Sequence, residues 1–188
     1  MITHIRYTTK SMIDEIYKNI VESCVEQKVN VEIPNHDYET ASFIYKTMFT
    51  NCTEEICIFA RGVKKEILDK DCVISAAKKF LDKKNTKIKI IYRYKDQEDK
   101  EKNENSTFIQ ELKKHSPSKL YITPSNGGTE WNENQASFSI GDNRMYRIRR
   151  DCPAKAVEGE AWVNFGNEKK TQDLKNKFET YLNQINHS

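Results

Sequence analysis

The chain has 188 residues, of which 37% are hydrophobic and 31% charged, and its formal net charge is +3. This length favours a single domain, and two Trp, eight Phe and nine Tyr are sufficient for a hydrophobic core. The small charge surplus excludes a strongly basic or acidic protein, so any affinity for nucleic acid depends on local clusters of charge. No apolar run approaches the ~18 residues that span a bilayer, and the first 20 residues lack the apolar core of a signal peptide, which predicts a cytosolic protein that does not enter membranes.

The first half of the chain alternates between helical and extended patterns. In residues 11–28, Ile13, Ile16 and Ile20 follow helical spacing, and a second stripe through Tyr17 and Val21 widens the apolar surface. Such a helix either packs one side on the body and the other on another subunit, or is buried as a whole. The next expected elements are a strand over 29–33 that ends at Pro34, a helix that begins near 35–37, a buried strand over 55–60, a helical stretch to about 84 that is split near 69–71, and a strand over 87–94.

The second half begins with residues 95–105 (KDQEDKEKNEN), which contain no apolar residue and predict a solvated loop. The further expected elements are a helix over 106–115, a strand over 119–123, a loop over 124–135, a hairpin of 136–140 and 145–150 around Gly141, a strand over 161–165 and a helix over 168–185. The β-α-β order of the early units predicts parallel strands, and the hairpin predicts an antiparallel part. We therefore expect an α/β (α+β) fold with a mixed β-sheet flanked by helices.

The segment 134–143 (NQASFSIGDN) and the strands around it resemble one half of the phospholipase-D-like fold. In that family each half carries H-x-K-x4-D on a late strand and the turn after it, and two halves face each other within one chain or across a dimer. In the family the His attacks a phosphodiester and the Lys holds its phosphate. Here Gln135 stands at the His position, Ser137 at the Lys position and Asp142 at the Asp position.

The resemblance extends over roughly residues 50–185. ICIFARG and KIKIIYRY resemble the first two strands of the family, and DNRMYRIRRD and AWVNFGN resemble the end of regulatory, often non-catalytic members. It implies a phospholipase-D-like domain over residues 50–188, with an N-terminal helical and strand segment over residues 1–49 packed on it as one structural unit.

The substituted motif predicts that the usual chemistry of the family is absent. The amide of Gln135 is neither basic nor ionisable near neutral pH, and Ser137 carries no charge to offset a phosphate. Asp142 has no positioned partner for acid–base catalysis. On a strand, Gln135, Ser137 and Ser139 share a polar face, which either lines the former catalytic cleft or is the exposed side of an ordinary edge strand. We expect no catalytic residue, no cofactor and no metal.

A group of arginines follows the motif and includes an aromatic residue, Tyr146. Guanidinium groups bind phosphate, and aromatic rings stack on bases, so this segment predicts binding of nucleic acid or another polyanion. Alternation places two of the arginines on the sheet face that carries Ser137. A protein partner and a solvated strand balanced by acidic neighbours are the alternatives. The arginines are Arg144, Arg147, Arg149 and Arg150.

Other candidates have simpler structural explanations. Arg61-Gly62 lies between a strand and a helix, where it either binds an anion at the helix N-terminus or only begins the helix. His36-Asp37 and His115 lie beside helix ends, where capping is the alternative to acid–base catalysis. Trp131 either packs over its loop or anchors a partner. The odd number of cysteines, five, with no C-x-x-C, predicts reduced structural thiols.

These patterns support three hypotheses of function. The first is a non-catalytic phospholipase-D-like module that acts as a homodimer or with a protein partner, and binds nucleic acid, in a bacterial defence or regulatory system. The second is a phosphodiesterase or nuclease with a rewired or partner-completed site. The third is a purely structural subunit of a complex.

Overall fold

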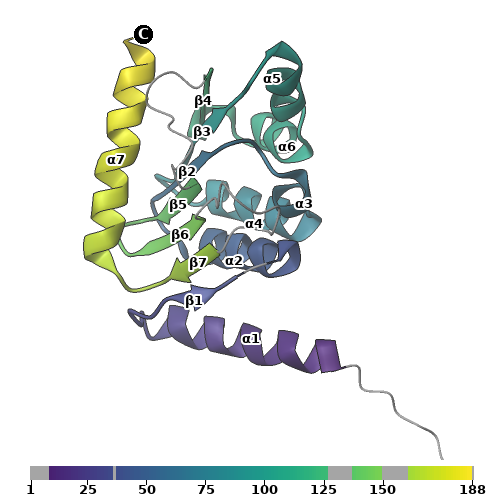
Figure 1. The fold of residues 1–188 in the computed structure, drawn as a ribbon, viewed down its shortest axis with the longest axis vertical. Helices are drawn as coiled ribbons and strands as arrows, with labels where there is room; N and C mark the ends of the chain where they lie inside the picture. Colours follow the sequence, from purple (N-terminus) through teal and green to yellow (C-terminus); the bar gives the residue numbers. More distant parts are fainter. Residues whose placement is uncertain (1–8, 36, 127–136, 150–160, 188) are drawn as a thin grey trace, which may run out of the picture.

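The computed structural model describes residues 9–35, 37–126, 137–149 and 161–187 (Figure 1). The strands of this part of the chain are β1 (Ile33–Pro34), β2 (Glu55–Ala60), β3 (Lys87–Arg93), β4 (Leu120–Ser125), β5 (Ser137–Gly141), β6 (Met145–Arg149) and β7 (Ala161–Asn164). The helices are α1 (Thr9–Glu26), α2 (Tyr38–Asn51), α3 (Lys65–Leu68), α4 (Asp71–Asp82), α5 (Gln97–Glu104), α6 (Thr107–His115) and α7 (Glu168–Asn186), and a 3-10 turn covers Pro117–Lys119.

The strands form one mixed sheet in the order β1-β7-β6-β5-β2-β3-β4. β2, β3 and β4 are parallel, whereas β5, β6, β7 and β1 pair with their neighbours in antiparallel fashion. The expected mixed sheet flanked by helices is therefore confirmed. Because β1 pairs with β7, segments from the two ends of the chain meet at one edge of the sheet.

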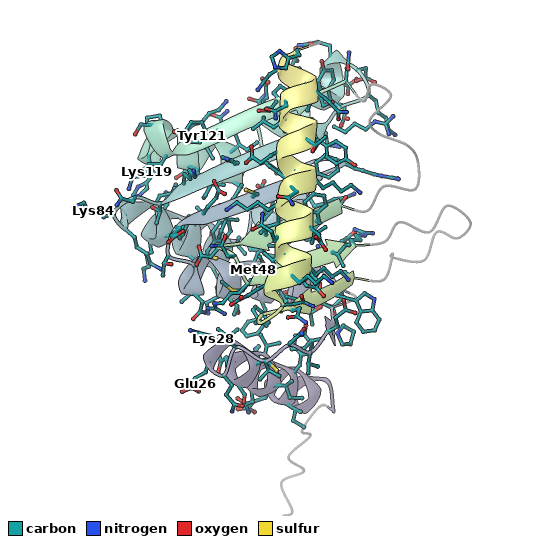
Figure 2. The ribbon with its side chains drawn as sticks, turned by 90° about the vertical axis from the view of Figure 1, so that its left-hand side faces the viewer. Glu26, Lys28, Met48, Lys84, Lys119 and Tyr121 are labelled. Atoms are coloured by element: carbon teal, nitrogen blue, oxygen red, sulfur yellow. The ribbon has the colours of Figure 1, made fainter. Side chains whose placement is uncertain are left out.

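Helices cover both faces of the sheet (Figures 1 and 2). On one face the even-numbered isoleucines of β2 and β3 pack with aromatic residues of α2, α4 and α6. On the other face α7 crosses the strands, and its Tyr181 stacks on Phe59 at 4.7 Å between ring centroids. Phe59 also stacks on Phe138 of β5 at 5.0 Å. Both faces of β5 are thus buried, which fixes its register in the sheet.

Residues 95–105 form a helix over Gln97–Glu104, so the predicted solvated loop is wrong. The side chain of Asp96 caps this helix by accepting from the Asp99 amide at 2.8 Å. Gln97 donates to Glu101 one turn later at 2.9 Å. A short helix held by its cap and by side-chain pairs needs no apolar stripe, which is why hydrophobic periodicity did not reveal it.

The strand predicted over 29–33 is also wrong in its bounds, since only Ile33 and Pro34 pair with a neighbour. Val31, which belongs to the alternating apolar pattern of 29–33, is 51% exposed and lies outside β1. Pro34 belongs to β1 as its last residue and pairs with Trp162, because β1 lies at the edge of the sheet, where proline costs no ladder hydrogen bond. β4 likewise runs two residues further than expected, to Ser125.

The helix α1 buries one of its two apolar stripes. Val21 and Val25 belong to the core, whereas Ile16 and Ile20 are 55% and 49% exposed. A helix buried as a whole is therefore excluded within this chain, and packing on another subunit stays a prediction. None of the described helices is long and apolar enough to cross a bilayer.

Candidate functional site

A cavity of about 220 Å³ lies at the carboxyl end of β2, on the face of the sheet that carries α2 and α3. Its cationic side chains come from two directions, from the loop after β2 and from β6. The polar residues that line it are Tyr45, Arg61, Lys64, Ser137, Arg147 and Arg149. The rest of the lining is apolar and includes Ile58, Ile67, Leu68 and Ile90. Among the described residues of this lining there is no carboxylate and no histidine.

The register of the hairpin brings the sequence candidates together. Ser137 pairs with Arg149 and Ser139 pairs with Arg147 across β5 and β6, so all four residues share one sheet face. This confirms the expected common face. β5 lies between β2 and β6, and Ser139 is only 1% exposed, so the alternative of an exposed edge strand is wrong.

Arg147 is the most buried of the described cations that line the cavity, at 6% exposure. Its Nε donates to Asn35 Oδ1 at 2.8 Å, and its guanidinium carbon lies 5.5 Å from the centroid of the Tyr45 ring. Burial lowers the pKa of Arg147, because the charged form loses its water. Arginine nevertheless stays protonated in proteins. Arg147 is therefore a positive charge in the protein interior, and its contacts with Asn35 and Tyr45 are contacts with neutral side chains.

The neutral partners are themselves fixed by long-range contacts. The Tyr45 hydroxyl and Ser139 Oγ are 2.7 Å apart, which holds the ring of α2 against β5. The backbone N–H of Asn35 donates to the Ala161 carbonyl at 2.8 Å and so continues the pairing of β1 with β7. The sequence analysis did not identify Tyr45 or Asn35 as site residues. Asn35 lies at the predicted start of a helix and Tyr45 within that helix, and a polar group is the only signal of either.

The loop that carries Arg61 and Lys64 is anchored by α5. Asn103, which is 5% exposed, accepts from the Val63 amide at 2.6 Å and donates to the Asp99 carbonyl at 2.7 Å. The helix after this loop, α3, has only four residues. An anion at its N-terminus stays a prediction, to which four residues contribute little helix dipole. Any attraction for anions at this place comes mainly from the side chains of Arg61 and Lys64.

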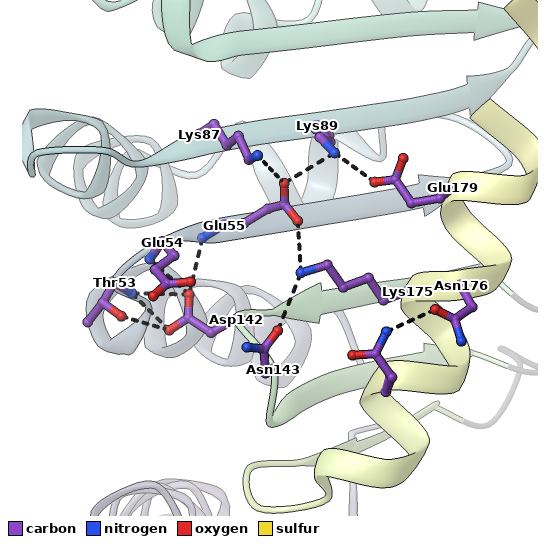
Figure 3. A network of polar contacts seen from close by, with 11 residues as sticks. Thr53, Glu54, Glu55, Lys87, Lys89, Asp142, Asn143, Lys175, Asn176 and Glu179 are labelled. Atoms are coloured by element: carbon purple, nitrogen blue, oxygen red, sulfur yellow. Dashed lines mark hydrogen bonds and ion pairs between the residues drawn. The ribbon is translucent and has the colours of Figure 1, made fainter. Parts of the chain in front are cut away.

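Asp142 lies at the other end of β5, away from the cavity (Figure 3). Its carboxylate accepts from the amides of Thr53, Glu54 and Glu55 at 2.9, 2.9 and 3.1 Å, and from Thr53 Oγ1 at 3.1 Å. Its backbone has a φ of 50°, which Asp tolerates better than most residues. Asp142 thus ties the hairpin turn to the start of β2, and its loss would affect folding before chemistry.

Glu55, next to this turn, is 7% exposed and is surrounded by three lysines (Figure 3). Its carboxylate oxygens lie 3.0 Å from Lys87 Nζ, 3.2 Å from Lys89 Nζ and 3.4 Å from Lys175 Nζ. Burial acts to raise the pKa of Glu55, but the lysines outweigh it, so the net shift is downward. This network joins α7 to the sheet.

The four arginines do not form one cluster. Arg144 lies at the turn end of β6 and donates to the Phe165 carbonyl at 2.8 Å, so it does not reach the cavity. Of the three arginines of this group that the structure describes, Arg147 and Arg149 line the cavity, and Arg150 lies outside the described residues. Gln135, His36, Trp131 and Cys152 lie outside them as well.

The remaining candidates have structural roles. Asp37 caps α2 by accepting from the Thr40 amide at 2.7 Å. His115 Nε2 lies 2.8 Å from Asp82 Oδ1, remote from the cavity lining. In the described part of the chain, no group of three or more His, Cys, Asp and Glu is placed to hold a metal ion, and Cys24, Cys52, Cys57 and Cys72 are free thiols.

Several solved structures have the same fold. TrmBL2, described as an archaeal chromatin protein with a novel mode of DNA binding, matches with a TM-score of 0.59 and 15% identity over 93% of this chain and 61% of its own. NucT from Helicobacter pylori matches with a TM-score of 0.54 and 16% identity over 82% of this chain and 96% of its own. Phosphatidylserine synthase from Haemophilus influenzae Rd KW20 matches with a TM-score of 0.50 and 8% identity over 85% of this chain and 40% of its own.

The chain thus spans less than two thirds of TrmBL2 and of the phosphatidylserine synthase. No family model and no curated protein sequence matches it. The structural likenesses include phospholipase-D-like folds and establish the fold of this chain as resembling one half of that architecture.

Proposed function

We propose that this chain is a non-catalytic phospholipase-D-like module that binds nucleic acid by its phosphates at the cavity lined by Arg61, Lys64, Arg147 and Arg149. The observation that carries the proposal is the burial of Arg147 between the neutral side chains of Asn35 and Tyr45. A buried cation with neutral partners is costly for the folded protein, and an anion in the cavity offsets that cost.

The composition of the cavity supports a phosphate as this anion. Two arginines and one lysine accompany Arg147, and guanidinium groups form paired hydrogen bonds with phosphate oxygens. Ser137 stands where the family places the Lys that holds phosphate, and its hydroxyl adds a neutral donor at the same place. TrmBL2, which has this fold, is described as binding DNA, and this favours nucleic acid as the source of the phosphate.

The same composition supports binding without cleavage. Cleavage of a phosphodiester needs a nucleophile and a group that transfers protons. The described lining offers Ser137 and Tyr45 as hydroxyls, but its charged groups are arginines and a lysine, of which arginine does not release its proton near neutral pH. Asp142 lies at the other end of β5 and is engaged by backbone amides.

We further propose that the module acts in association, as a homodimer or with a protein partner, in a bacterial defence or regulatory system. The half-domain architecture supports this, since the halves of phospholipase-D-like proteins face each other in pairs. The exposed Ile16 and Ile20 of α1 provide a second apolar surface for such contacts. Analytical ultracentrifugation of the isolated chain tests self-association, and a monomer at all accessible concentrations would leave only a different protein as the partner.

Binding and cleavage assays with single-stranded and double-stranded DNA and RNA test the proposal, in the presence and absence of EDTA. We expect salt-sensitive binding and no cleavage under either condition. Lys64→Gln and Arg149→Gln should each weaken binding and lower the slope of log K against log salt by about 0.7 for a single strand. Lys84→Gln removes the same charge from an exposed position near the start of β3 and serves as the matched control (Figure 2).

Two results would refute the proposal. Cleavage by the purified protein would restore the phosphodiesterase hypothesis. The second is an equal loss of binding in Lys84→Gln, Lys64→Gln and Arg149→Gln. It would show that general surface charge, and not the cavity, holds the nucleic acid.

A further inference from the structure

The pairing of the strands orders the lining of the cavity by depth. Ile58 of β2 pairs with Ile90 of β3 on one side and with Ser139 of β5 on the other. Arg147 of β6 pairs with Ser139, so one row of residues crosses all four strands. This row is buried, whereas Ser137, two residues nearer the start of β5, is only partly buried. The row of Ile58 and Arg147 therefore forms the inner end of the cavity.

The buried part of the lining is mostly aliphatic. Ile58 and Ile90 contribute to it from the sheet, and Ile67 and Leu68 contribute to it from α3, each at most 5% exposed. Among the buried residues of the described lining, Arg147 is the only charged one. A phosphate drawn fully into the cavity would exchange water for aliphatic side chains over most of its surface, which is costly for so strongly hydrated a group.

A nucleobase suits both the aliphatic and the cationic parts of this lining. Its faces pack on apolar side chains, and its edges carry carbonyl oxygens and ring nitrogens that accept hydrogen bonds. Arg147 has more N–H donors than the one that bonds Asn35, so its guanidinium can donate to such an edge. The cavity of about 220 Å³ corresponds to roughly seven water molecules at their volume in the liquid, which is room for one base and not for a stack.

We infer that the cavity takes one unstacked base of a nucleic-acid strand, while the phosphate beside that base stays at the exposed outer end with Lys64. This inference rests on the proposed function and specifies which part of the nucleic acid enters the cavity. A single strand supplies such a base readily, because its bases are not held by pairing. The base then covers aliphatic surface, and the phosphate keeps part of its water.

Ala60 offers a way to fill the cavity without a change of charge. It lines the cavity from β2, lies on the same sheet face as Ile58 two residues before it, and is only partly buried. Ala60→Leu adds aliphatic volume where the base would lie. Ala60→Ser keeps the side chain small and is the matched control.

The test compares two single strands of equal length, one with its bases and one made of abasic nucleotides. Both compete, unlabelled, with one fluorescent strand in anisotropy measurements at fixed salt. We expect the wild-type protein to bind the abasic strand about tenfold more weakly. Ala60→Leu should bind both strands at the abasic level, with an unchanged salt dependence, whereas Ala60→Ser should keep the tenfold difference.

The outcomes separate this inference from the proposed function. Equal binding of the two strands by the wild type, still weakened by Lys64→Gln, would overturn the inference and leave a module that binds phosphates alone. Failure of both strands to bind would overturn both proposals.

The variant adds two further outcomes that would overturn the inference. A preference for the strand with bases that persists in Ala60→Leu would place base recognition elsewhere on the protein. Equal loss of both strands in an Ala60→Leu protein that circular dichroism shows to be folded would mean that the phosphate itself enters the cavity.

Discussion

Replacement of Asp142 by Ala should destabilise the fold strongly, although the residue aligns with the catalytic motif. The carboxylate accepts four hydrogen bonds from Thr53, Glu54 and Glu55, at 2.9 to 3.1 Å. Hydrogen bonds to charged groups contribute about 1.5–3 kcal/mol each when buried, and these contribute less because water reaches Thr53 and Glu54. We take about 3 kcal/mol for the set of four hydrogen bonds.

The backbone adds to this cost, because residue 142 has a φ of 50°. Ala is strained in that conformation by about 1 kcal/mol, whereas Asn and Gly accept it. The total for Asp142→Ala is thus about 4 kcal/mol, a large part of the 5–15 kcal/mol that stabilises a typical domain. Asp142→Gly should cost about 3 kcal/mol, and Asp142→Asn, which keeps an acceptor oxygen, about 1–2 kcal/mol.

Urea denaturation followed by circular dichroism measures these differences, provided that the dependence on denaturant stays unchanged. Asp173→Ala, at an exposed position of α7, is the control and should alter the free energy of unfolding by less than about 0.5 kcal/mol. The reasoning would be refuted if Asp142→Ala lost less than about 1 kcal/mol, or if Ala, Gly and Asn at this position were equally stable. Loss of any activity in Asp142→Ala therefore reports on folding, and does not identify a catalytic carboxylate.

Two further predictions concern the loop before α3 and the acidic centre of the lysine network. Asn103→Ala removes the acceptor of the buried Val63 amide, so we expect a loss of about 1–3 kcal/mol in the free energy of unfolding. Hydrogen exchange at Val63 should become faster, and anion binding should weaken. Unchanged exchange at Val63 would contradict the anchoring role of Asn103. The lowered pKa of Glu55 means that its contribution to stability is present above its ordinary pKa of 4.5 and is lost as the pH falls through the lower value in the folded protein. Glu55→Gln should thus reduce the decline of Tm with acidification below pH 4.5, and an acid limb as steep as that of the wild type would argue against this assignment.

The sequence allowed most of the fold to be predicted because burial leaves a periodic pattern. The apolar runs of β2 and β3 and the spaced apolar residues of α2, α4 and α7 each encode their own environment. By contrast, α5 has no apolar face and is held by a cap and by side-chain pairs, and the pattern at 29–33 had no neighbour to complete a strand. The residues of one segment do not show whether a second strand lies beside it.

The candidate site was predictable only where it follows strand alternation. Ser137, Arg147 and Arg149 share a face because residues two apart on a strand always do, and the hairpin turn fixed which residues lie opposite one another. Asn35 and Tyr45 were missed, since they lie 112 and 94 positions from the residues that they contact. The bonds of Asp142 to Thr53, Glu54 and Glu55 likewise depend on tertiary structure alone.

The pairing of β1 with β7 also affects how the protein is made. Ile33 has no strand beside it until Val163 has left the ribosome, and at about 5–20 residues per second this takes many seconds. During that interval the buried stripe of α1 and the open edge of β1 remain available to other chains and to chaperones. Asn35 is held beside Arg147 by its bond to Ala161, so the cavity around Arg147 is completed only after residues 161–164 have been synthesised.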